Sequence, residues 1–521
     1  MPVFHFRKTP NYMHKRLFFL GFFAILIFTL LLRIIPAINN NFLFTMDQAN
    51  DAVNVREILT RHIIPLHGPM TSIEGFFNGP IWYWFLSVGY AATDGHPFGG
   101  LFLLMLFNTA IVGYTMWIVK KYVSPRQALC IGASFIFFWP LYDASRYAFN
   151  PFPLVGFARL LIFFLVEALC GNERMFILAA LPVGLAAHTE IASFFPLALL
   201  YGGTGLGMVL KHYLKPRYFV ISIAFVLLLF LPYGISELQT NFSQMHSIYK
   251  HAQSSRSFFS GTQFTTISWV TLNLIAEGII PKQPVLSALL FFPLVGFVLW
   301  KGPKAKRRER FLYFFTVLSV VLFFLTWLWF SVNTGWHGWH TVYIPPLIFL
   351  LTLLILFSLR KIFTIPLLVL ILVAQFSTFA QQYSIFFRSS DDPSLLVNEL
   401  GVIDWVYQES GGQGFYVYAY LPSVYDYPYQ YLFWWYGRKQ YGFVPCEYST
   451  YPGTPDLFVP GVKYYQEPKK PCGLYRFLII EPDSNTGLQN EWLEGVRAKT
   501  TLVKETHIGK IMLEKRKQTE K

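Results

Sequence analysis

The chain has 521 residues, of which 54% are hydrophobic, 19% are aromatic and only 13% are charged. This composition excludes an ordinary soluble domain and indicates a polytopic membrane protein. The net charge of +14 does not indicate a nucleic-acid partner. The lysines and arginines lie in short loops between apolar runs, as the positive-inside rule requires, and do not form one basic face.

The first apolar run, 17–36, follows the cations Arg7, Lys8, Lys15 and Arg16. It is long and has no small-residue cleavage site, so we expect a retained span with a cytoplasmic N-terminus. The run 80–92 is too short to cross a hydrocarbon core of roughly 30 Å. Its aromatic residues suit a helix that lies in the membrane interface. Placing this run outside the membrane puts every later basic loop in the cytoplasm.

With this orientation, the further spans are predicted at 98–119, 127–142, 151–170, 175–187, 191–210, 217–234, 284–300, 311–330, 340–359 and 362–380. The fold class is therefore a polytopic α-helical membrane domain, 1–384, with about eleven spans, N-in and C-out. The first loop, 37–97, and the long loop 235–283 then lie on the extracytoplasmic side.

From 385 to 521 the composition changes to alternating aromatic and polar residues with Gly and Pro turns. This pattern predicts an extracytoplasmic α/β domain, with strands at 414–421, 475–482 and 507–515 and a helix at 392–410. The aromatic run 425–436 favours core packing over contact with the bilayer or with sugar. Cys446 and Cys472 could pair if the domain faces outward.

Asp47 and Asp51 lie four residues apart in the loop that follows the first span, so on a helix they share one face. Two carboxylates at the membrane surface can serve as a general base and as a partner for a cation or metal. The alternative is that acids near a helix start only interact with the helix dipole and cap free amides. We favour a functional role for Asp47, and both interpretations stay open for Asp51.

The turn 142–151, at an outward end of two predicted spans, carries Asp143, Arg146 and Asn150. Asp143 and Arg146 are three residues apart, so they either pair on a helix end or contact a ligand. Arg159 lies about two turns inside the next predicted span, where a buried guanidinium needs an anion. Its partner is either a group within the bundle or a lipid phosphate.

Three further clusters interrupt the apolar pattern. His188 and Glu190 either line a cavity or satisfy each other. A basic stripe in the long outer loop either cradles a phosphate or forms a solvated face, and it consists of His246, Lys250, His251 and Arg256. An aromatic and histidine cluster, expected in any case at an interface, consists of Trp336, His337, Trp339, His340 and Tyr343. These histidines lack acids at zinc-enzyme spacing, so only the Asp47 and Asp51 pair leaves a divalent cation open.

Together these features resemble the GT-C glycosyltransferases, most closely the bacterial branch related to protein O-mannosyltransferases and lipid A aminoarabinose transferases. The resemblance covers about residues 10–380 and rests on layout and on short motifs. The motifs are Asp47 just past the first span, FFNGPIWYW with Pro80 opening an interfacial helix, the turn SRYAFNP, and WHTVYIPP at the start of a late span.

The resemblance implies a sugar donor on a polyprenyl-phosphate carrier, with Asp47 as the base that activates the acceptor. Two departures stand out, because Gln48 replaces the Glu of many relatives and Gly79 replaces a Lys of the aminoarabinose branch. The phosphate contact then falls to other cations. Besides the base, the candidate substrate- and phosphate-binding residues are Asp51, Asn78, Tyr83, Asp143, Arg146, Asn150, Arg159, His188, Glu190, Lys250, Arg256, His337, His340 and Tyr343.

The sequence therefore predicts a multi-pass glycosyltransferase of a cell membrane, of the bacterial inner-membrane type, with an extracytoplasmic active site. Its acceptor is a protein, a lipid or a glycan. No phosphate-cradling glycine loop, nucleophile elbow or ATP motif is present, so hydrolysis-driven transport is not predicted. Two alternatives stay open: a non-catalytic transporter of lipid-linked glycans, and an oligosaccharide ligase that uses pyrophosphate-linked donors.

Overall fold

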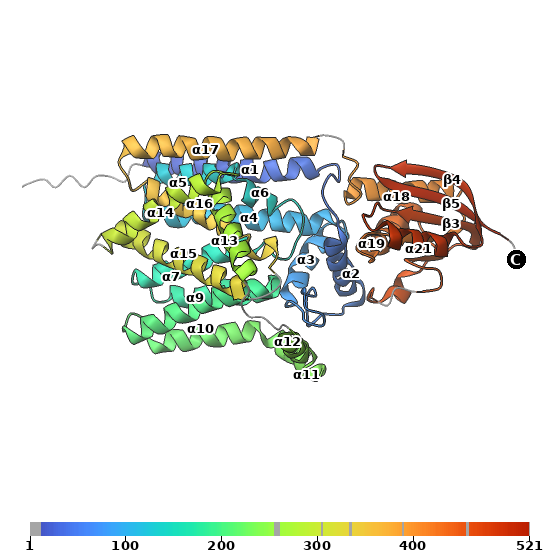
Figure 1. Ribbon diagram of the computed structural model, residues 1–521, viewed down its shortest axis with the longest axis horizontal. Coiled ribbons are helices and arrows are strands. Elements are labelled where there is room, and N and C mark those ends of the chain that lie inside the picture. Colours follow the sequence, from blue (N-terminus) through green and yellow to red (C-terminus); the bar gives the residue numbers. More distant parts are fainter. Residues whose placement is uncertain are drawn as a thin grey trace, which may run out of the picture.

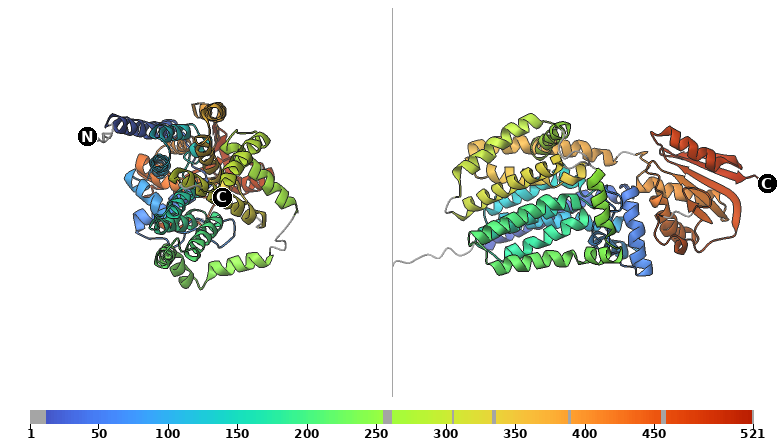
Figure 2. Two further views of the ribbon diagram at one scale, coloured as in Figure 1. Left: turned by 90° about the vertical axis from the view of Figure 1, so that its left-hand side faces the viewer. Right: turned by 60° about the horizontal axis from the view of Figure 1, so that its bottom comes forward.

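A computed structural model describes residues 12–254, 261–303, 306–332, 336–387, 390–454 and 458–519. These residues form a bundle of roughly aligned helices and a smaller α/β domain beyond one end of it (Figure 1). Helices α2 and α3 lie at the end of the bundle that faces the α/β domain. A view rotated about the long axis shows the same arrangement (Figure 2).

Seven helical segments among the described residues are long and apolar enough to cross a membrane. They comprise α1 (Tyr12–Ala37), α4 (Phe98–Val119), α9 (Ile191–Leu210), α14 (Pro284–Lys301), α15 (Arg307–Val332), η1 with α16 (Gly338–Thr341 and Ile344–Leu356), and α17 with η2 (Lys361–Tyr383 and Ser384–Phe387). An eighth candidate bends by 46° between α10 (Pro216–Leu229) and α11 (Leu231–Gln239). The chain is therefore a polytopic helical membrane protein.

Shorter helices complete the bundle: α5 (Pro125–Ile136), α6 (Trp139–Asp143), α7 (Leu154–Leu169) and α8 (Met175–Thr189). Most side chains of α7 are buried, and this helix packs against α8. The span predicted over 127–142 is broken, because α5 ends at Ile136 and α6 begins at Trp139. Pro140 explains the break, since its ring removes a backbone donor and clashes with the preceding turn of a continuous helix.

Helices also occupy both predicted outer loops. The first loop contains α2 (Met46–Arg61) and α3 (Ile81–Ala92), and α3 is the short helix expected at 80–92. The second loop contains α12 (Ser243–Ser254) and α13 (Gly261–Gly278), and α13 packs against α14, α15 and α16. The sequence did not predict α13, because its buried apolar residues are interspersed with Thr, Ser and Asn.

The C-terminal domain contains a five-stranded sheet in the order β2-β1-β3-β5-β4, with the first three strands parallel and β5 antiparallel to both neighbours. Its strands are β1 (Gly414–Tyr420), β2 (Glu447–Ser449), β3 (Cys472–Ile480), β4 (Thr500–Ile508) and β5 (Ile511–Gln518). Its helices are α18 (Leu396–Glu409), α19 (Tyr427–Leu432), η3 (Phe433–Gly437), α20 (Arg438–Tyr441), η4 (Val462–Tyr465) and α21 (Thr486–Arg497).

The mixed α/β prediction is confirmed, with one correction. The segment 507–515 is not one strand but contains the end of β4, a turn and the start of β5, because Gly509 adopts a left-handed φ of 57° between the two strands. The aromatic run 425–436 forms core, as the sequence favoured. Tyr429, Tyr431 and Phe433 are at most 1% exposed, and α19 packs against α2.

Cys446 and Cys472 form a disulfide that joins the start of β2 to the start of β3, and Cys130 and Cys170 are free. In denatured, unreduced protein we expect only the two free cysteines to react with a maleimide, and all four after reduction. Intact mass spectrometry measures the number of adducts. Four adducts before reduction would contradict the pairing.

Candidate active site

The first turn of α2 presents Asp47 beside a capping interaction. The backbone N–H of Thr45 donates to Oε1 of Gln48 at 3.0 Å, and its hydroxyl donates to the same atom at 2.7 Å. These contacts belong to a capping box, which satisfies polar groups that the helix start leaves free. Gln48 is 3% exposed. The residue that replaces the Glu of many relatives therefore fixes the start of α2.

The Asp47 side chain is open to solvent and forms no hydrogen bond or ion pair with another residue that the structure describes. The surrounding protein nevertheless raises the pKa of its carboxyl above the ordinary value, through partial desolvation. The pKa of Tyr147 is raised to about 12, first by burial and then in part by the negative charges of Asp143 and Asp47. Asp47 therefore lies near the turn that carries Asp143 and Tyr147.

Asp51, one turn further along α2, is 3% exposed and accepts a hydrogen bond from Nε1 of Trp82 at 2.6 Å. Desolvation raises the pKa of its carboxyl well above the ordinary value, and the hydrogen bond from Trp82 opposes this in part. Asp51 thus joins α2 to α3. Its carboxyl faces the indole rather than solvent.

The turn after α6 supplies an exposed ion pair. Nε of Arg146 lies 2.6 Å from Oδ1 of Asp143, and the two side chains are 25% and 34% exposed. The expected pairing on a helix end is therefore present. Glu277, near the end of α13, lies close enough to Asp143 for their negative charges to repel.

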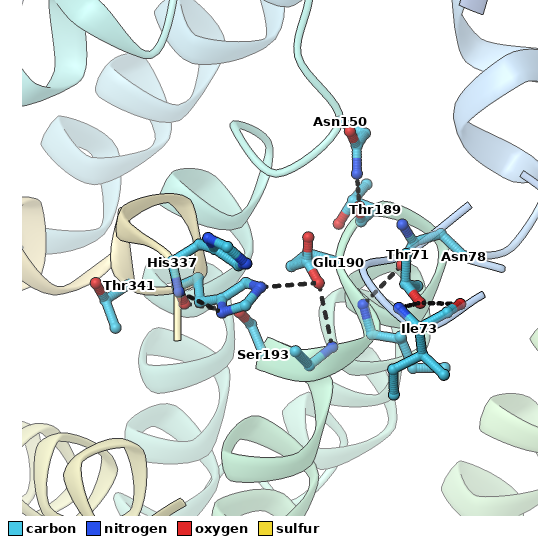
Figure 3. A network of polar contacts seen from close by, with 12 residues as sticks. Thr71, Ile73, Asn78, Asn150, Thr189, Glu190, Ser193, His337 and Thr341 are labelled. Atoms are coloured by element: carbon cyan, nitrogen blue, oxygen red, sulfur yellow. Dashed lines mark hydrogen bonds and ion pairs between the residues drawn. The ribbon is translucent and has the colours of Figure 1, made fainter. Parts of the chain in front are cut away.

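A second polar cluster surrounds the break between α8 and α9 (Figure 3). Oδ1 of Asn78 accepts from the backbone N–H of Ile191 at 2.9 Å, and the amide of Asn150 donates to the carbonyl of Thr189. Glu190 caps α9, and its Oε1 lies 3.8 Å from Nε2 of His340. The cluster therefore joins the first loop, the turn after α6, α9 and η1.

Burial shapes the chemistry of this cluster. Desolvation raises the pKa of the Glu190 carboxyl to about 7. The hydrogen bond that this carboxyl accepts from the backbone N–H of Ala192 lowers the pKa in part. Ser193 donates its hydroxyl to the carbonyl of His340 at 2.7 Å, and the backbone N–H of His337 donates to Nδ1 of His340 at 3.2 Å. His340 is thus held on both sides. Glu190 therefore lies beside the imidazole of His340, whereas His188, which the sequence offered as its partner, contacts the carbonyl of Leu229.

Aromatic rings connect the two groups of polar residues. Tyr147 stacks near Phe149 with centroids 5.8 Å apart, and Phe149 meets the edge of Trp339 at 5.8 Å. Trp339 stacks on His337 at 4.4 Å. Ring contacts therefore lead from Tyr147, which lies near Asp47, to His337 in the polar cluster around Glu190.

The surroundings of Gly79 leave no room for the Lys that the resemblance to the aminoarabinose branch implies at this position. A Cβ at this position would lie 1.8 Å from Nδ1 of His188. His188 is fully buried, and its Nε2 lies 2.9 Å from the carbonyl of Leu229. Any side chain at Gly79 would displace the imidazole, so a phosphate-binding Lys has no room here.

Most of the remaining candidate residues are buried, one is exposed on α12, and one lies outside the described residues. Tyr83 is 2% exposed within α3, and Tyr343 is fully buried with its hydroxyl 2.8 Å from that of Thr326. Lys250 is exposed on α12. Arg159 is fully buried in α7. Arg256 lies outside the described residues.

Sequence reasoning missed Tyr147, Ser193, Glu277 and Arg33, all of which lie at this end of the bundle. Arg33 had a usable signal, because it is a lone cation inside the first apolar run. The sequence carries no comparable signal for Tyr147, Ser193 or Glu277, since their importance depends on neighbours distant in sequence. Among the described residues, no group of three or more His, Cys, Asp or Glu side chains is arranged to hold a metal ion.

The fold resembles that of ArnT over nearly the whole chain. Two crystal structures of ArnT from Cupriavidus metallidurans, a lipid A aminoarabinose transferase, match 97% of this chain over 98% of their own length at 12% identity. The TM-score is 0.60 for the apo state and 0.58 for the form bound to undecaprenyl phosphate. The expected resemblance is therefore confirmed as a likeness of fold. No protein-family model and no curated protein sequence matches the chain.

The contact between Gly79 and His188 generates a stability prediction. We expect Gly79→Ala to destabilise the protein by about 1–3 kcal/mol, because the added methyl group must push aside a buried ring. The matched control is Gly207→Ala in α9, where a Cβ meets no atom within 4 Å. Thermal unfolding in detergent compares them. Equal midpoints for the two variants would contradict the close contact.

The raised pKa of Asp51 generates a pH prediction. The folded protein binds this proton more tightly than the unfolded chain does, so stability is lost as pH rises through the raised pKa. Asp51→Asn keeps an oxygen acceptor for Trp82 and does not titrate. We therefore expect the unfolding midpoint of Asp51→Asn, relative to wild type, to rise between about pH 4.5 and about pH 7.5.

The matched control for this series is Glu74→Gln, which removes an exposed carboxyl from the same loop. Because this side chain is exposed to solvent, its replacement is not expected to reproduce the rise of Asp51→Asn. If the difference in unfolding midpoint between Asp51→Asn and wild type did not change with pH, the Asp51 carboxyl would not have the raised pKa.

Proposed function

We propose that this protein is an integral membrane glycosyltransferase that moves a sugar from a polyprenyl-phosphate donor to an extracytoplasmic acceptor. One observation carries the proposal. Asp47 is a solvent-open, unpaired carboxyl among the described residues, in a fold shared over nearly the whole chain with a protein crystallised with undecaprenyl phosphate. The acceptor is a protein, a lipid or a glycan.

Asp47 acts as the general base in this proposal. It takes the proton of the acceptor hydroxyl, whose oxygen attacks the anomeric carbon while the bond to the carrier phosphate breaks. The raised pKa of Asp47 makes it a stronger base than an ordinary aspartate at neutral pH. The departing polyprenyl phosphate gains negative charge, which nearby cations stabilise. A single displacement of this kind inverts the anomeric carbon.

The other candidate residues divide by exposure. Asp143, Arg146 and His337 are partly exposed near Asp47 and contact the substrate. A different set is at most 8% exposed and positions the loops around the substrate: Asn78, Asn150, His188, Glu190 and His340. Lys250, exposed on α12, supplies positive charge at the outer edge of the proposed substrate site. No divalent cation is required by this arrangement of roles.

The proposed topology has about eleven spans, a cytoplasmic N-terminus and an extracytoplasmic C-terminal domain. The placement of the basic loops supports it. The Cys446–Cys472 disulfide in the C-terminal domain supports it independently, because disulfides persist in oxidising compartments. In this orientation Asp47, α2 and the C-terminal domain share one side of the membrane.

The direct mutational prediction concerns Asp47→Asn. We expect sugar transfer to fall by about 10²–10⁴-fold, the usual contribution of a positioned base. Binding of the lipid-linked donor should be retained, because the amide preserves the shape of the side chain. The assay measures product formation and donor binding by purified protein in lipid nanodiscs.

The control variant is Glu74→Gln, which neutralises an exposed acid of the same loop and is expected to transfer sugar like wild type. Unchanged transfer by Asp47→Asn would exclude Asp47 as the base. If wild type bound and moved the donor across the bilayer without forming any glycosidic product, the protein would be a transporter instead.

A further inference from the structure

The sheet of the C-terminal domain is covered unevenly on its two faces. Side chains of α18 and α19 share one core with Phe415 of β1 and Phe477 of β3, on the face that lies toward α2. On the opposite face, Trp492 of α21 packs with Tyr420, at the end of β1. Tyr416, at the start of β1, is only partly buried on the same face. Helix α21 therefore covers the ends of the parallel strands more fully than their starts.

A cavity of about 330 Å³ lies at the starts of these strands. The side chains that line it include Tyr416 of β1, Glu447 and Ser449 of β2, and Gln466 and Lys469 of the loop before β3. Its volume is at the lower end of the range of small-molecule sites, roughly 300–1,000 Å³. The lining combines one aromatic ring with a few polar groups, which is typical of a binding site.

The cavity lies at the end of the molecule that is remote from the helical bundle. The backbone N–H of Lys510 donates to the carbonyl of Asp391 at 3.0 Å, so the turn between β4 and β5 lies beside the segment that leaves the bundle. Strand β5 starts at this turn, and β3 runs antiparallel to β5, so β3 and its parallel neighbours start at the opposite end. The C-terminus, which follows β5, also lies at that end (Figure 1). The cavity is therefore separate from the site around Asp47.

Strand β2 supplies fixed hydrogen-bond acceptors to the cavity. Oε1 of Glu447 accepts from the backbone N–H of Gly453 at 2.6 Å, and its Oε2 accepts from the hydroxyl of Tyr418 at 3.2 Å. Each carboxylate oxygen keeps a lone pair for a second hydrogen bond. Ser449 donates its hydroxyl to the carbonyl of Tyr451 at 2.7 Å, so its oxygen also keeps acceptor capacity. Both acceptors are held in place before any ligand binds.

The loop before β3 supplies donors. Nζ of Lys469 lies 3.4 Å from Oε1 of Gln466, which uses one of the three donors of the ammonium group. The side-chain amide nitrogen of Gln466 donates to no other residue that the structure describes. Tyr416 lies directly opposite Glu447 in the parallel pairing of β1 with β2. The cavity thus brings together an aromatic ring, fixed acceptors and available donors.

The disulfide between Cys446 and Cys472 joins the two polar sides of the cavity, and both cysteines line it. Cys446 precedes the acceptors of β2, and Cys472 follows the loop that carries the donors. A site that is already formed loses less conformational entropy when a ligand binds. The crosslink therefore favours binding of a small ligand that depends on several weak hydrogen bonds.

We propose that this cavity binds one saccharide unit of a glycan, with the sugar ring against Tyr416 and its hydroxyl groups bonded to Glu447, Gln466 and Lys469. Sugar hydroxyls both donate and accept, so they match a wall that carries acceptors as well as donors. The apolar face of a sugar ring packs on an aromatic side chain. The Glu447 carboxylate disfavours a phosphate group through its negative charge. This inference goes beyond the proposed transfer reaction, because it involves neither Asp47 nor a lipid-linked donor.

Saturation-transfer difference NMR on the full-length protein tests the inference. The probes are maltose, chitobiose and digalacturonate, with tetraglycine as a non-sugar comparison. The protein is held in lipid nanodiscs, because the head group of a maltoside detergent would compete for the cavity. We expect wild type to bind at least one of the sugars at millimolar concentration and not tetraglycine. Tyr416→Ala is expected to weaken this binding by about tenfold or more, because the sugar loses the ring against which it packs.

Three further variants separate stacking from hydrogen bonding and from loss of folding. Tyr416→Phe keeps the ring and is expected to bind within about threefold of wild type, whereas Lys469→Met removes a donor and is expected to weaken binding by about three- to tenfold. The control is Tyr464→Ala, which removes a tyrosine that is 68% exposed and does not line the cavity. It is expected to bind sugar like wild type. Thermal unfolding in the same nanodiscs confirms that each variant is folded.

Each outcome has a defined meaning. Sugar binding that is present in wild type and lost in folded Tyr416→Ala supports the inference. Equal binding by Tyr416→Ala and wild type would place the sugar elsewhere in the protein and would overturn it. Failure of wild type to bind any of the three sugars, or binding of tetraglycine in their place, would overturn it as well. None of these results depends on sugar transfer by Asp47→Asn, so the cavity and the proposed base stand or fall separately.

Discussion

The arrangement of the whole molecule depends on how α2 is held between the bundle and the C-terminal domain. On one side, the hydrogen bond from Trp82 to Asp51 joins α2 to α3. On the other, the buried guanidinium of Arg56 donates to the carbonyls of Gln430 and Pro460 and lies 3.6 Å from the ring centroid of Tyr465. Asp47 extends from the start of this doubly fixed helix.

Because α2 is fixed on both faces, the C-terminal domain affects the site without contributing an identified catalytic group. The connection preceding α18 is also attached to the first loop, through the hydrogen bond from Phe44 N–H to the carbonyl of Ser394 at 2.9 Å. A rigid site reduces the motion of a base relative to its substrate, which is a requirement for efficient proton transfer. The domain thus contacts and fixes the loop that carries Asp47.

Buried charges within the bundle differ in whether another side chain pairs with them. At one end of α7, Glu167 accepts from the hydroxyl of Tyr122 at 2.5 Å and pairs with Lys121 at 3.3 Å. At the other end, Arg159 lacks any such partner among the described residues. A buried charge that is left unpaired costs more than one that is paired within the protein.

The sequence predicted what depends on local pattern. Apolar length identified the long spans, and the change of composition located the α/β domain. It did not predict the break at Pro140, the helix α13 or the role of Gly509, because each depends on packing or on a turn that periodicity does not reveal. Nor did it predict that Gly79 meets His188, since that contact joins residues distant in sequence.

The central claim is that the protein transfers a sugar with displacement of a polyprenyl phosphate. The most direct measurement is mass spectrometry of the lipid released when purified protein turns over lipid-linked sugars from the cell's own membrane extract. The account predicts polyprenyl monophosphate in equal amount to the glycosylated product. Release of polyprenyl pyrophosphate would indicate an oligosaccharide ligase, and the absence of any released lipid would contradict the transfer reaction altogether.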